Sequence, residues 1–223
     1  MSYYPIYLEL EGKIVLVVGG GSVARRKVEV LLAYGAIVHI VSKSLSPELN
    51  NMVETGSVLQ IGEVFDNKHL DDAFLAIAAT DDTGLNHVIS QEARKRGILV
   101  NAVDQPLDCD FIVPSIIRKG NLSIAISTSG KSPALAKKIR KQMDLLFGKE
   151  YERFLVLMGT LRPEILSLGL KQEENSRIFH EIVHSDILGA LADEKWGEVE
   201  EILNRILPKP MAAKDIINGL EKS

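Results

Sequence analysis

The sequence predicts an α/β protein with a doubly wound parallel sheet, followed by a small β-hairpin and helix unit and an all-α C-terminal domain. Three observations support this prediction. Short β-branched runs alternate with amphipathic segments over residues 13 to 103, two β-runs joined by a turn come next, and the last third has only helical periodicity. Alternation of strands and helices indicates βαβ units, and these repeats are too few to close a barrel.

The first strand and helix are the clearest elements. Residues 13–18 (KIVLVV) form a β-branched apolar run that ends in glycines, as expected for a strand buried on both faces. A helix is predicted from Ser22 to Tyr34, because its apolar residues recur at helical spacing, and Gly35 stands at the C-cap position. The same alternation predicts strands over 36–42, 58–63, 73–80 and 98–103, with helices that begin near Ser46-Pro47 and span 83–96.

The pattern changes after Asp104. Residues 111–117 (FIVPSII) and 122–128 (LSIAIST) flank a four-residue turn that contains glycine, which predicts an antiparallel hairpin. Ser132-Pro133 supplies an N-cap and a proline at the first position of a helix through Phe147. The sequence therefore predicts three parts, namely a dinucleotide-binding domain over 1–110, a dimerisation and substrate-binding unit over 111–150, and a helical domain over 151–223.

Composition and charge exclude several classes of protein. The 223 residues are 46% hydrophobic and 25% charged, which is typical of a globular chain, and the net charge of −4 argues against a nucleic-acid binder. Cys109 is the single cysteine, so neither an internal disulfide nor a cysteine-rich zinc site is expected. The sequence contains no apolar run of membrane-spanning length. We therefore expect a cytoplasmic protein with no resident metal and no membrane partner.

The segment Gly19-Gly20-Gly21-Ser22-Val23-Ala24 fits the pattern G-x-G-x-x-A. The first glycine permits the tight turn, the second lets the backbone approach a pyrophosphate, and the small last residue allows close packing. This segment follows a predicted buried strand and opens a helix, whose N-terminus favours anions. The pattern predicts a Rossmann-like dinucleotide site that includes Gly19 and Gly21, although such glycines can also serve only to shape a turn.

The acidic residue that usually binds the adenosine ribose is absent. Ser42, Lys43 and Ser44 stand at that strand end instead. Hydroxyls and a cation there resemble a site for the 2′-phosphate of NADP. The alternative is that the two serines satisfy a turn and the lysine is solvated, so spacing alone leaves NAD and NADP open.

Polar residues also follow the next two predicted strands. Thr80 and Asp81 are candidates for contacts with the nicotinamide half of the cofactor, because ligands bind outside the carboxyl ends of such strands. Asp81 or Asp82 can equally cap the following helix. Asn101 and Asp104 follow the last parallel strand, and an acid at that position can exchange protons with a substrate beside the cofactor. A loop aspartate can also be only a turn former.

A third group of polar residues lies between a predicted strand and helix. Hydroxyls, a glycine and a cation gather at a helix N-terminus, which is a favourable place for carboxylates or phosphates. The alternative is a well-capped helix with a solvated basic face. The members of this group are Ser127, Thr128, Ser129, Gly130, Lys131 and Ser132.

With these residues assembled, the chain resembles the precorrin-2 dehydrogenase and sirohydrochlorin ferrochelatase family over roughly residues 4 to 150. The resemblance rests on the order of four segments, and other Rossmann proteins do not share them as a set. These segments are PIYLELEGKIVLVVGGGSVARRK, LAIAATDD followed by LN, NAVDQPLDCDFIVPSII, and LSIAISTSGKSPALAKKIR.

The resemblance implies NAD-dependent oxidation of the tetrapyrrole precorrin-2 to sirohydrochlorin. Some members of the family then insert ferrous iron. A homodimer with its contact around residues 111–150 is also implied, and the family generally lacks the ribose acid. The rival interpretations are a non-catalytic NAD(H)-sensing module and an NADP-dependent reductase of another small acid.

The same resemblance assigns roles to individual residues. Ser22 and Val23 would contact the pyrophosphate, and Lys43 and Ser44 the adenosine ribose. Asp104 matches the aspartate that transfers protons in the family, and residues 127–132 would bind substrate carboxylates. Asn101, at the end of the last parallel strand, is a further candidate for substrate binding. Asp108 and Asp110, close to Asp104 in the sequence, receive no role.

Overall fold

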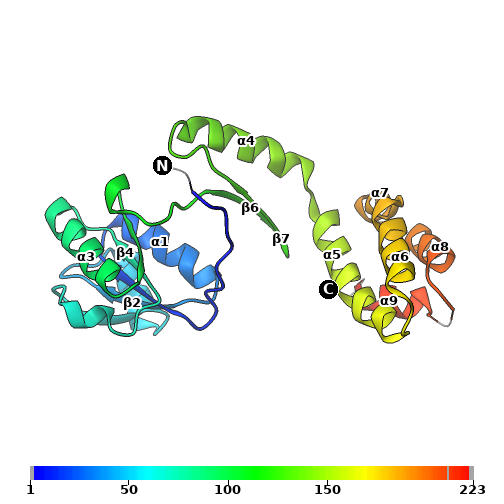
Figure 1. Cartoon of the computed structure of the whole chain (residues 1–223), viewed down its shortest axis with the longest axis horizontal. Helices are drawn as coiled ribbons and strands as arrows, with labels where there is room; N and C mark the ends of the chain where they lie inside the picture. Colours follow the sequence, from blue (N-terminus) through cyan, green and yellow to red (C-terminus); the bar gives the residue numbers. More distant parts are fainter. Residues whose placement is uncertain (1–2, 210, 221–223) are drawn as a thin grey trace. The chain divides into compact units, whose positions relative to one another are not determined.

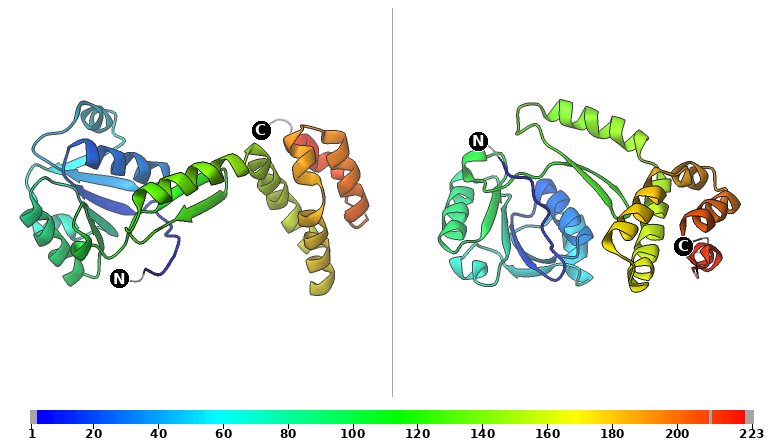
Figure 2. Two further views of the ribbon diagram at one scale, coloured as in Figure 1. Left: turned by 90° about the horizontal axis from the view of Figure 1, so that it is seen from above. Right: turned by 45° about the vertical axis from the view of Figure 1, so that its right-hand side comes forward.

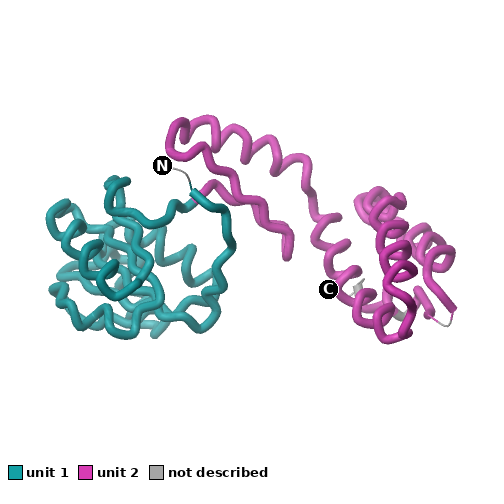
Figure 3. Tube along the Cα trace, in the orientation of Figure 1, with its two compact units in different colours: residues 1–113 teal, residues 114–223 magenta. Residues whose placement is uncertain are grey.

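A computed structural model describes residues 3–209 and 211–220 of the chain. The chain divides into two compact units, residues 1–113 and residues 114–223 (Figure 3). The hairpin and helix that the sequence predicted as a separate part thus share a unit with the C-terminal helices.

The first unit contains a five-stranded parallel sheet with the strand order β3-β2-β1-β4-β5. The central strand β1 is fully apolar, and its residues Val15 to Val17 have no exposed surface. The sheet confirms the predicted doubly wound fold, and every strand lies within its predicted range. The bounds are β1 Ile14–Val18, β2 Ile37–Val41, β3 Leu59–Gly62, β4 Leu75–Ala78 and β5 Leu99–Ala102.

Helices cover both faces of this sheet (Figure 1). Helices α1 (Ser22–Ala33) and α2 (Pro47–Glu54) pack on the face that carries Val15 and Val17. Helix α3 (Thr83–Lys95) and the 3-10 turns η1 (Asn67–Leu70) and η2 (Pro106–Asp108) lie with the opposite face, which carries Leu16 and Val18. Because alternate residues of a strand point to opposite faces, the continuous apolar run of β1 serves both layers.

Local signals begin and end these helices as the sequence predicted. The Ser46 hydroxyl accepts a hydrogen bond from the Leu49 amide at 3.3 Å, which caps α2. After α1, Gly35 adopts a φ of 74°, a left-handed conformation that glycine adopts without steric cost.

The second unit opens with an antiparallel hairpin of β6 (Ser115–Lys119) and β7 (Leu122–Ile126). The prediction of a strand from residue 111 was wrong at its start, because β6 begins only at Ser115. Pro114 has no amide proton for a strand ladder, and the carbonyl of Phe111 accepts a hydrogen bond from Asn101 at 3.0 Å in the first unit. The hairpin turn is also tighter than predicted, since both strands continue up to Gly120 and Asn121.

Helices make up the rest of the second unit. Helix α4 (Pro133–Leu146) packs on β6, and α5 (Lys149–Ser167) contacts both hairpin strands. The C-terminal helices share an apolar core that includes Leu157, Leu161 and Ile182, all without exposed surface, and they form one bundle in Figure 2. The all-α prediction is confirmed by α6 Gln172–His184, α7 Ile187–Ala192, α8 Trp196–Ile206 and α9 Ala213–Leu220.

Candidate functional site

The candidate site begins at the turn that joins β1 to α1. Gly19 has a φ of 124°, and its amide donates a hydrogen bond to the carbonyl of Val41 at 2.9 Å. A Cβ atom on Gly19 would collide with the carbonyl oxygen of Ala79, which directly follows β4. The missing side chain therefore lets the loops after β1 and β4 meet where the strand order reverses, the place where such sheets bind ligands.

The same loop is also tied to the turn after β2. The Ser46 amide donates to the carbonyl of Gly20 at 2.8 Å. A Cβ atom on Gly20 would collide with the carbonyl oxygen of Ser44. Loops from three strands are thus in close contact at the carboxyl edge of the sheet.

Gly21 is the N-cap of α1 and leaves the helix end open. No side chain caps this end, and the first turn carries no acidic residue. An ideal Cβ atom on Gly21 would meet nothing within 4 Å. The free N–H groups and the positive end of the helix dipole favour an anionic group in this space. The geometry of Gly21, Ser22 and Val23 thus fits the pyrophosphate of a dinucleotide.

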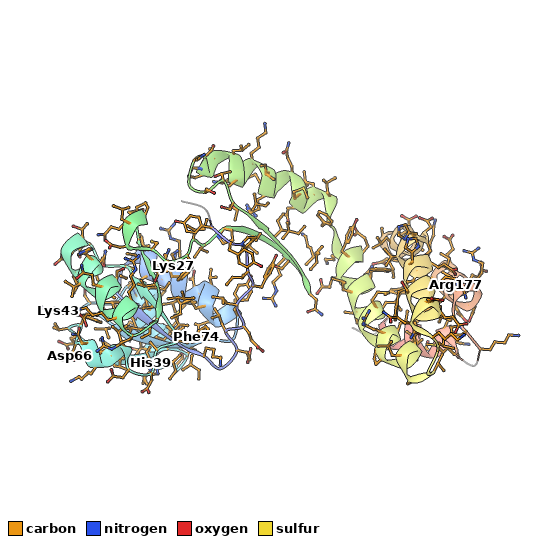
Figure 4. The ribbon with its side chains drawn as sticks, in the orientation of Figure 1. Lys27, His39, Lys43, Asp66, Phe74 and Arg177 are labelled. Atoms are coloured by element: carbon orange, nitrogen blue, oxygen red, sulfur yellow. The ribbon has the colours of Figure 1, made fainter. Side chains whose placement is uncertain are left out.

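The turn after β2 presents both hydroxyl and cationic groups. The Ser42 hydroxyl donates to the carbonyl of Ser44 at 2.7 Å, and the side-chain amide of Gln60 donates to the carbonyl of Ser42 at 2.9 Å. Lys43 is exposed, at the rim of the unit in Figure 4. Because the single proton of Ser42 is already donated, its oxygen is left as an acceptor for a ligand.

The loop after β4 is held by a buried asparagine. The side-chain oxygen of Asn86 accepts hydrogen bonds from the Thr80 hydroxyl at 2.7 Å and from the Thr80 amide at 3.2 Å, and Asn86 is only 1% exposed. The Asp82 carboxylate accepts from the Leu85 amide at 3.0 Å and caps α3. Asp81 is exposed at the same sheet edge. The helix cap, which the sequence left between Asp81 and Asp82, is therefore Asp82.

The two candidates after β5 differ in their surroundings. Asn101 is 8% exposed, and its side-chain amide donates to the carbonyl of Phe111 at 3.0 Å. Asp104 is exposed and adopts a φ of 58°, which is uncommon for a residue other than glycine. Asn101 thus anchors the chain behind the loop, while Asp104 presents its carboxylate to solvent at the carboxyl edge of the sheet.

Lys27 is a residue that sequence reasoning missed. It lies on α1, is half-buried, and is labelled in Figure 4. Burial lowers the pKa of its ammonium group, with the charge of Arg26 acting in the same direction, whereas the interactions with Cys109 and Asp104 raise it. In the sequence Lys27 follows two arginines and resembles part of a solvated face, so no local signal marks it.

The predicted anion site lies in the second unit, at the N-terminus of α4. The Ser127 hydroxyl accepts from the Ser129 amide at 3.0 Å, and the Thr128 hydroxyl accepts from the Ser132 amide at 3.2 Å. The Ser132 hydroxyl caps α4 by accepting from the Leu135 amide at 3.2 Å. Each of these hydroxyls accepts a backbone N–H and keeps its own proton to donate to an anion.

The backbone of this loop is shaped for a tight turn. Ser129 and Gly130 have φ values of 52° and 77°. Lys131 is exposed beside them, and the basic residues Lys137, Lys138 and Lys141 are exposed along α4. The loop therefore combines hydroxyl donors with positive charge, as carboxylate binding requires.

Within residues 3–209 and 211–220, no group of three or more His, Cys, Asp or Glu side chains is arranged to hold a metal ion. Over the same described residues, no helix combines the length and the apolar character needed to cross a membrane.

Two family descriptions match the sequence. Residues 6–115 match the family described as "Putative NAD(P)-binding", and residues 119–144 match "Sirohaem biosynthesis protein central". The first match covers the glycine loop, the turn after β2 and Asp104. Residues 6–115 are therefore similar to NAD(P)-binding domains.

Curated relatives and one solved structure extend this result. "Siroheme synthase 1" of Serratia proteamaculans is 42% identical over 165 residues, which are 74% of this chain and 35% of that protein. "Siroheme synthase" of Zymomonas mobilis is 36% identical over 210 residues, 94% of this chain and 44% of that protein. The chain thus spans less than half the length of these relatives. The solved structure "SirC, precorrin-2 dehydrogenase" is 25% identical, with a TM-score of 0.72 over 99% of this chain and 100% of that chain.

The glycine loop gives the first testable prediction. The variant Gly21→Ala should fold with nearly unchanged stability, because the added Cβ atom enters open space. The same atom occupies the space for the pyrophosphate, so the variant should bind the dinucleotide at least about 10-fold more weakly. Calorimetric titration with NAD⁺ measures the change. Undiminished affinity would contradict the assignment of this space to the pyrophosphate.

Gly19→Ala is the matched comparison within the same loop. This variant combines a positive φ with a backbone collision, so its free energy of unfolding should fall by more than about 2 kcal/mol. Denaturant unfolding would detect the difference between the two glycine variants. Equal stability of the two variants would show that the close approach to Ala79 is unimportant.

The buried cation of Lys27 gives a pH-dependent prediction. The pKa of Lys27 in the folded chain lies below its ordinary value of 10.5, so the unfolded chain binds more protons between these two values. The free energy of unfolding attributable to Lys27 therefore rises with pH across that window. Lys27→Met should raise the Tm at neutral pH by about 1 to 3 °C, and this gain should vanish as the pH approaches 10.5.

Thermal unfolding from neutral pH upward measures this effect. Lys43→Met, a change at an exposed lysine of the same unit, is the control and should show no such trend. A gain for Lys27→Met that persists at high pH would mean that better packing, and not removal of a buried charge, is responsible.

Proposed function

We propose, from its matches to an NAD(P)-binding family and to a sirohaem-biosynthesis family, that the chain is an NAD-dependent dehydrogenase that oxidises precorrin-2 to sirohydrochlorin. The reaction consumes NAD⁺ and yields NADH and a proton. Because the chain matches less than half the length of its curated relatives, the activity, the substrate and the partners are proposals for this chain.

One observation carries the proposal. Gly19–Gly21 and Asp104 follow β1 and β5, which belong to one parallel sheet with β4 between them. The loops after β1 and β5 therefore leave the same edge of the sheet. Because one strand lies between β1 and β5, the two loops begin about 10 Å apart, which is twice the usual distance between neighbouring strands. A dinucleotide held at the first loop extends along this edge, and a substrate next to it can meet the carboxylate of Asp104.

Asp104 is the proposed catalytic base. When bound, NAD⁺ supplies the hydride acceptor, and the proton lost together with the hydride needs an acceptor of its own. The carboxylate of Asp104 is exposed and makes no ion pair with another residue in the described part of the chain. It is therefore available to take that proton.

The turn after β2 favours NAD over NADP. The Ser42 oxygen has already donated its proton, and it lies 2.7 Å from the Ser44 carbonyl oxygen, so both oxygens present lone pairs. A ribose 2′-hydroxyl can donate to such a pair of acceptors, whereas a 2′-phosphate has no proton to give at neutral pH. The charge of exposed Lys43 would favour a 2′-phosphate, so the preference for NAD rests on Ser42.

Substrate carboxylates are proposed to bind the loop of residues 127–132. Precorrin-2 is a polycarboxylate, and the hydroxyls of Ser127, Thr128 and Ser132 each keep a proton to donate. Lys131 adds positive charge. This local site reconciles an anionic substrate with an acidic chain.

Insertion of ferrous iron into sirohydrochlorin is the second candidate activity. Metal insertion requires a base that removes the pyrrole protons, and the exposed carboxylate of Asp104 provides one. Iron would be a substrate in this reaction.

A homodimer formed through the hairpin and α4 is part of the proposal. Helix α4 leaves Leu135, Leu145 and Leu146 47%, 88% and 64% exposed, although its core side buries only Ala136. Exposed apolar residues that cluster on one helix favour burial against a partner. A second copy of the chain is the partner that the family resemblance implies.

The activity is tested by incubating the chain with precorrin-2 and either NAD⁺ or NADP⁺. We expect NADH and sirohydrochlorin to form in equal amounts, with NAD⁺ preferred. Asp104→Asn should lower kcat by at least about 100-fold and leave the Kd for NAD⁺ within about twofold. Asp72→Asn, an exposed carboxylate before β4 at the opposite edge of the sheet, should leave kcat unchanged.

Three outcomes distinguish the rival functions. Cofactor binding without turnover would favour an NAD(H)-sensing module. Reduction of another small acid by NADPH would favour the reductase. Iron insertion that depends on Asp104 would add the chelatase, and it is measured by adding ferrous iron to sirohydrochlorin with the wild type and with Asp104→Asn.

The assembly is tested by replacing Leu145 and Leu146 with glutamate. The wild-type chain should sediment as a dimer, and the double variant should have about half that mass. The reason is that burying two unpaired carboxylates in the apolar contact between the copies is too costly. Val183→Glu, at a 49% exposed position of α6, is the control and should stay dimeric. A monomeric wild type would contradict the proposed dimer.

A further inference from the structure

We propose that His87 and Asp108 are positioning residues that hold the loop of Asp104 in its active arrangement, an inference that rests on the proposed function of Asp104. Asp108 received no role in the sequence, and His87 lies on α3, away from the glycine loop. Neither residue is proposed to touch the substrate. Their effect would be transmitted through Gln105, the neighbour of Asp104.

The loop needs such support because of its backbone conformation. Asp104 adopts a φ of 58°, a strained conformation for a residue other than glycine that persists only where the surroundings enforce it. The turn itself is closed weakly, by a hydrogen bond of 3.4 Å from the Gln105 amide to the carbonyl of Ala102. Contacts outside the turn must therefore supply the enforcement.

Asp108 is the buried centre of these contacts. The residue is 7% exposed, and its carboxylate oxygen lies 2.7 Å from Nδ1 of His87. Its backbone carbonyl accepts from the Ser90 hydroxyl at 2.9 Å. A buried carboxylate is costly unless it is paired. The pairing with His87 and Ser90 therefore binds this part of the loop to α3.

The orientation of His87 is set from its other side. The side-chain amide nitrogen of Gln91, one turn further along α3, lies 2.9 Å from Nε2 of His87. An amide nitrogen only donates, so Nε2 accepts, and the proton of neutral His87 is on Nδ1, where it is donated to Asp108. The network thus assigns the tautomer that can donate a hydrogen bond to Asp108.

Gln105 connects this pair to Asp104. Its side-chain amide nitrogen donates to the second carboxylate oxygen of Asp108 at 3.3 Å and to the carbonyl of Thr83 at 3.0 Å. The side-chain oxygen of Gln105 is buried without a hydrogen-bond partner. An unpaired buried oxygen destabilises the fold. We expect a destabilising group of this kind next to Asp104 if the position of Asp104 contributes more to function than the lost stability costs.

The far end of the loop has a separate anchor. The Asp110 carboxylate accepts from Arg94 at 2.8 Å and from the Val100 amide at 3.1 Å. Asp110 follows Asp104 by several residues, beyond η2. We therefore assign the support of Asp104 to His87 and Asp108, while Arg94 holds Asp110 and also donates to the carbonyl of Leu107 at 3.1 Å.

The experiment compares His87→Leu with His87→Asn in the full chain. Leucine removes the donor, so kcat for precorrin-2 oxidation should fall about 10- to 100-fold, because a small misplacement of a catalytic group has effects of this size. The asparagine amide can stand where Nδ1–H stands and should keep kcat within about threefold of wild type. The Kd for NAD⁺ and the KM for precorrin-2 should stay within about twofold in both variants.

Gln105→Met keeps the proposal falsifiable if His87→Leu fails to fold. Methionine fills a similar volume, so the chain should still fold, whereas kcat should fall about 10-fold because the hydrogen bond from Gln105 to Asp108 is lost. Arg96→Gln is the matched control, because Arg96 pairs with Glu92 and Asp71 and does not contact the loop. Its kcat should equal that of the wild type.

Exchange of the backbone amide hydrogens of Asp104, Gln105, Leu107 and Asp108 provides a readout besides activity. Exchange should speed up in His87→Leu and Gln105→Met and stay unchanged in His87→Asn. Full kcat in His87→Leu or Gln105→Met, or equal losses in the leucine and asparagine variants, would overturn the inference. An inactive wild type would overturn the proposed function instead. In that case, unchanged hydrogen exchange in the variants would separately overturn the proposal that His87 and Asp108 hold the loop of Asp104.

Discussion

The close approach of Gly19 to the carbonyl of Ala79 is the constraint on which the rest of the first unit depends. Because no side chain separates them, the loops after β1 and β4 meet at the point where the strand order reverses. That contact directs the open N-terminus of α1 along the carboxyl edge of the sheet. The loop after β5, with Asp104, leaves the same edge, so cofactor binding and proton transfer are brought to one side of the sheet.

Hydroxyl protons distinguish the two kinds of polar loop in this chain. Ser42 donates its proton to a neighbouring carbonyl and is left as an acceptor, which suits a ribose hydroxyl. Ser127, Thr128 and Ser132 accept backbone amides and keep their protons, which suits carboxylates. Residues of the same chemical type thus favour different ligands, because the local backbone determines which side of each hydroxyl remains available.

Two charged side chains of opposite sign, Lys27 and Asp108, are wholly or partly buried near the loop that carries Asp104. Lys27 is half-buried and has a lowered pKa because of that burial, while Asp108 is almost wholly buried and paired with His87. Each is less favourable for stability than an apolar side chain of similar size would be. Two such unfavourable groups near one loop are typical of a functional site, where a protein accepts a loss of local stability.

The sequence by itself determined the order of strands and helices, the glycine loop, the caps at Ser46 and Ser132, and the helical character of the last third. These features depend on periodicity and on residues within a few positions of one another. The start of β6 at Ser115, the inward role of Asn101, the burial of Lys27 and the pairing of His87 with Asp108 were decided only by the tertiary structure. Each depends on residues separated by many positions, such as His87 and Asp108, which only the folded sheet brings within 2.7 Å.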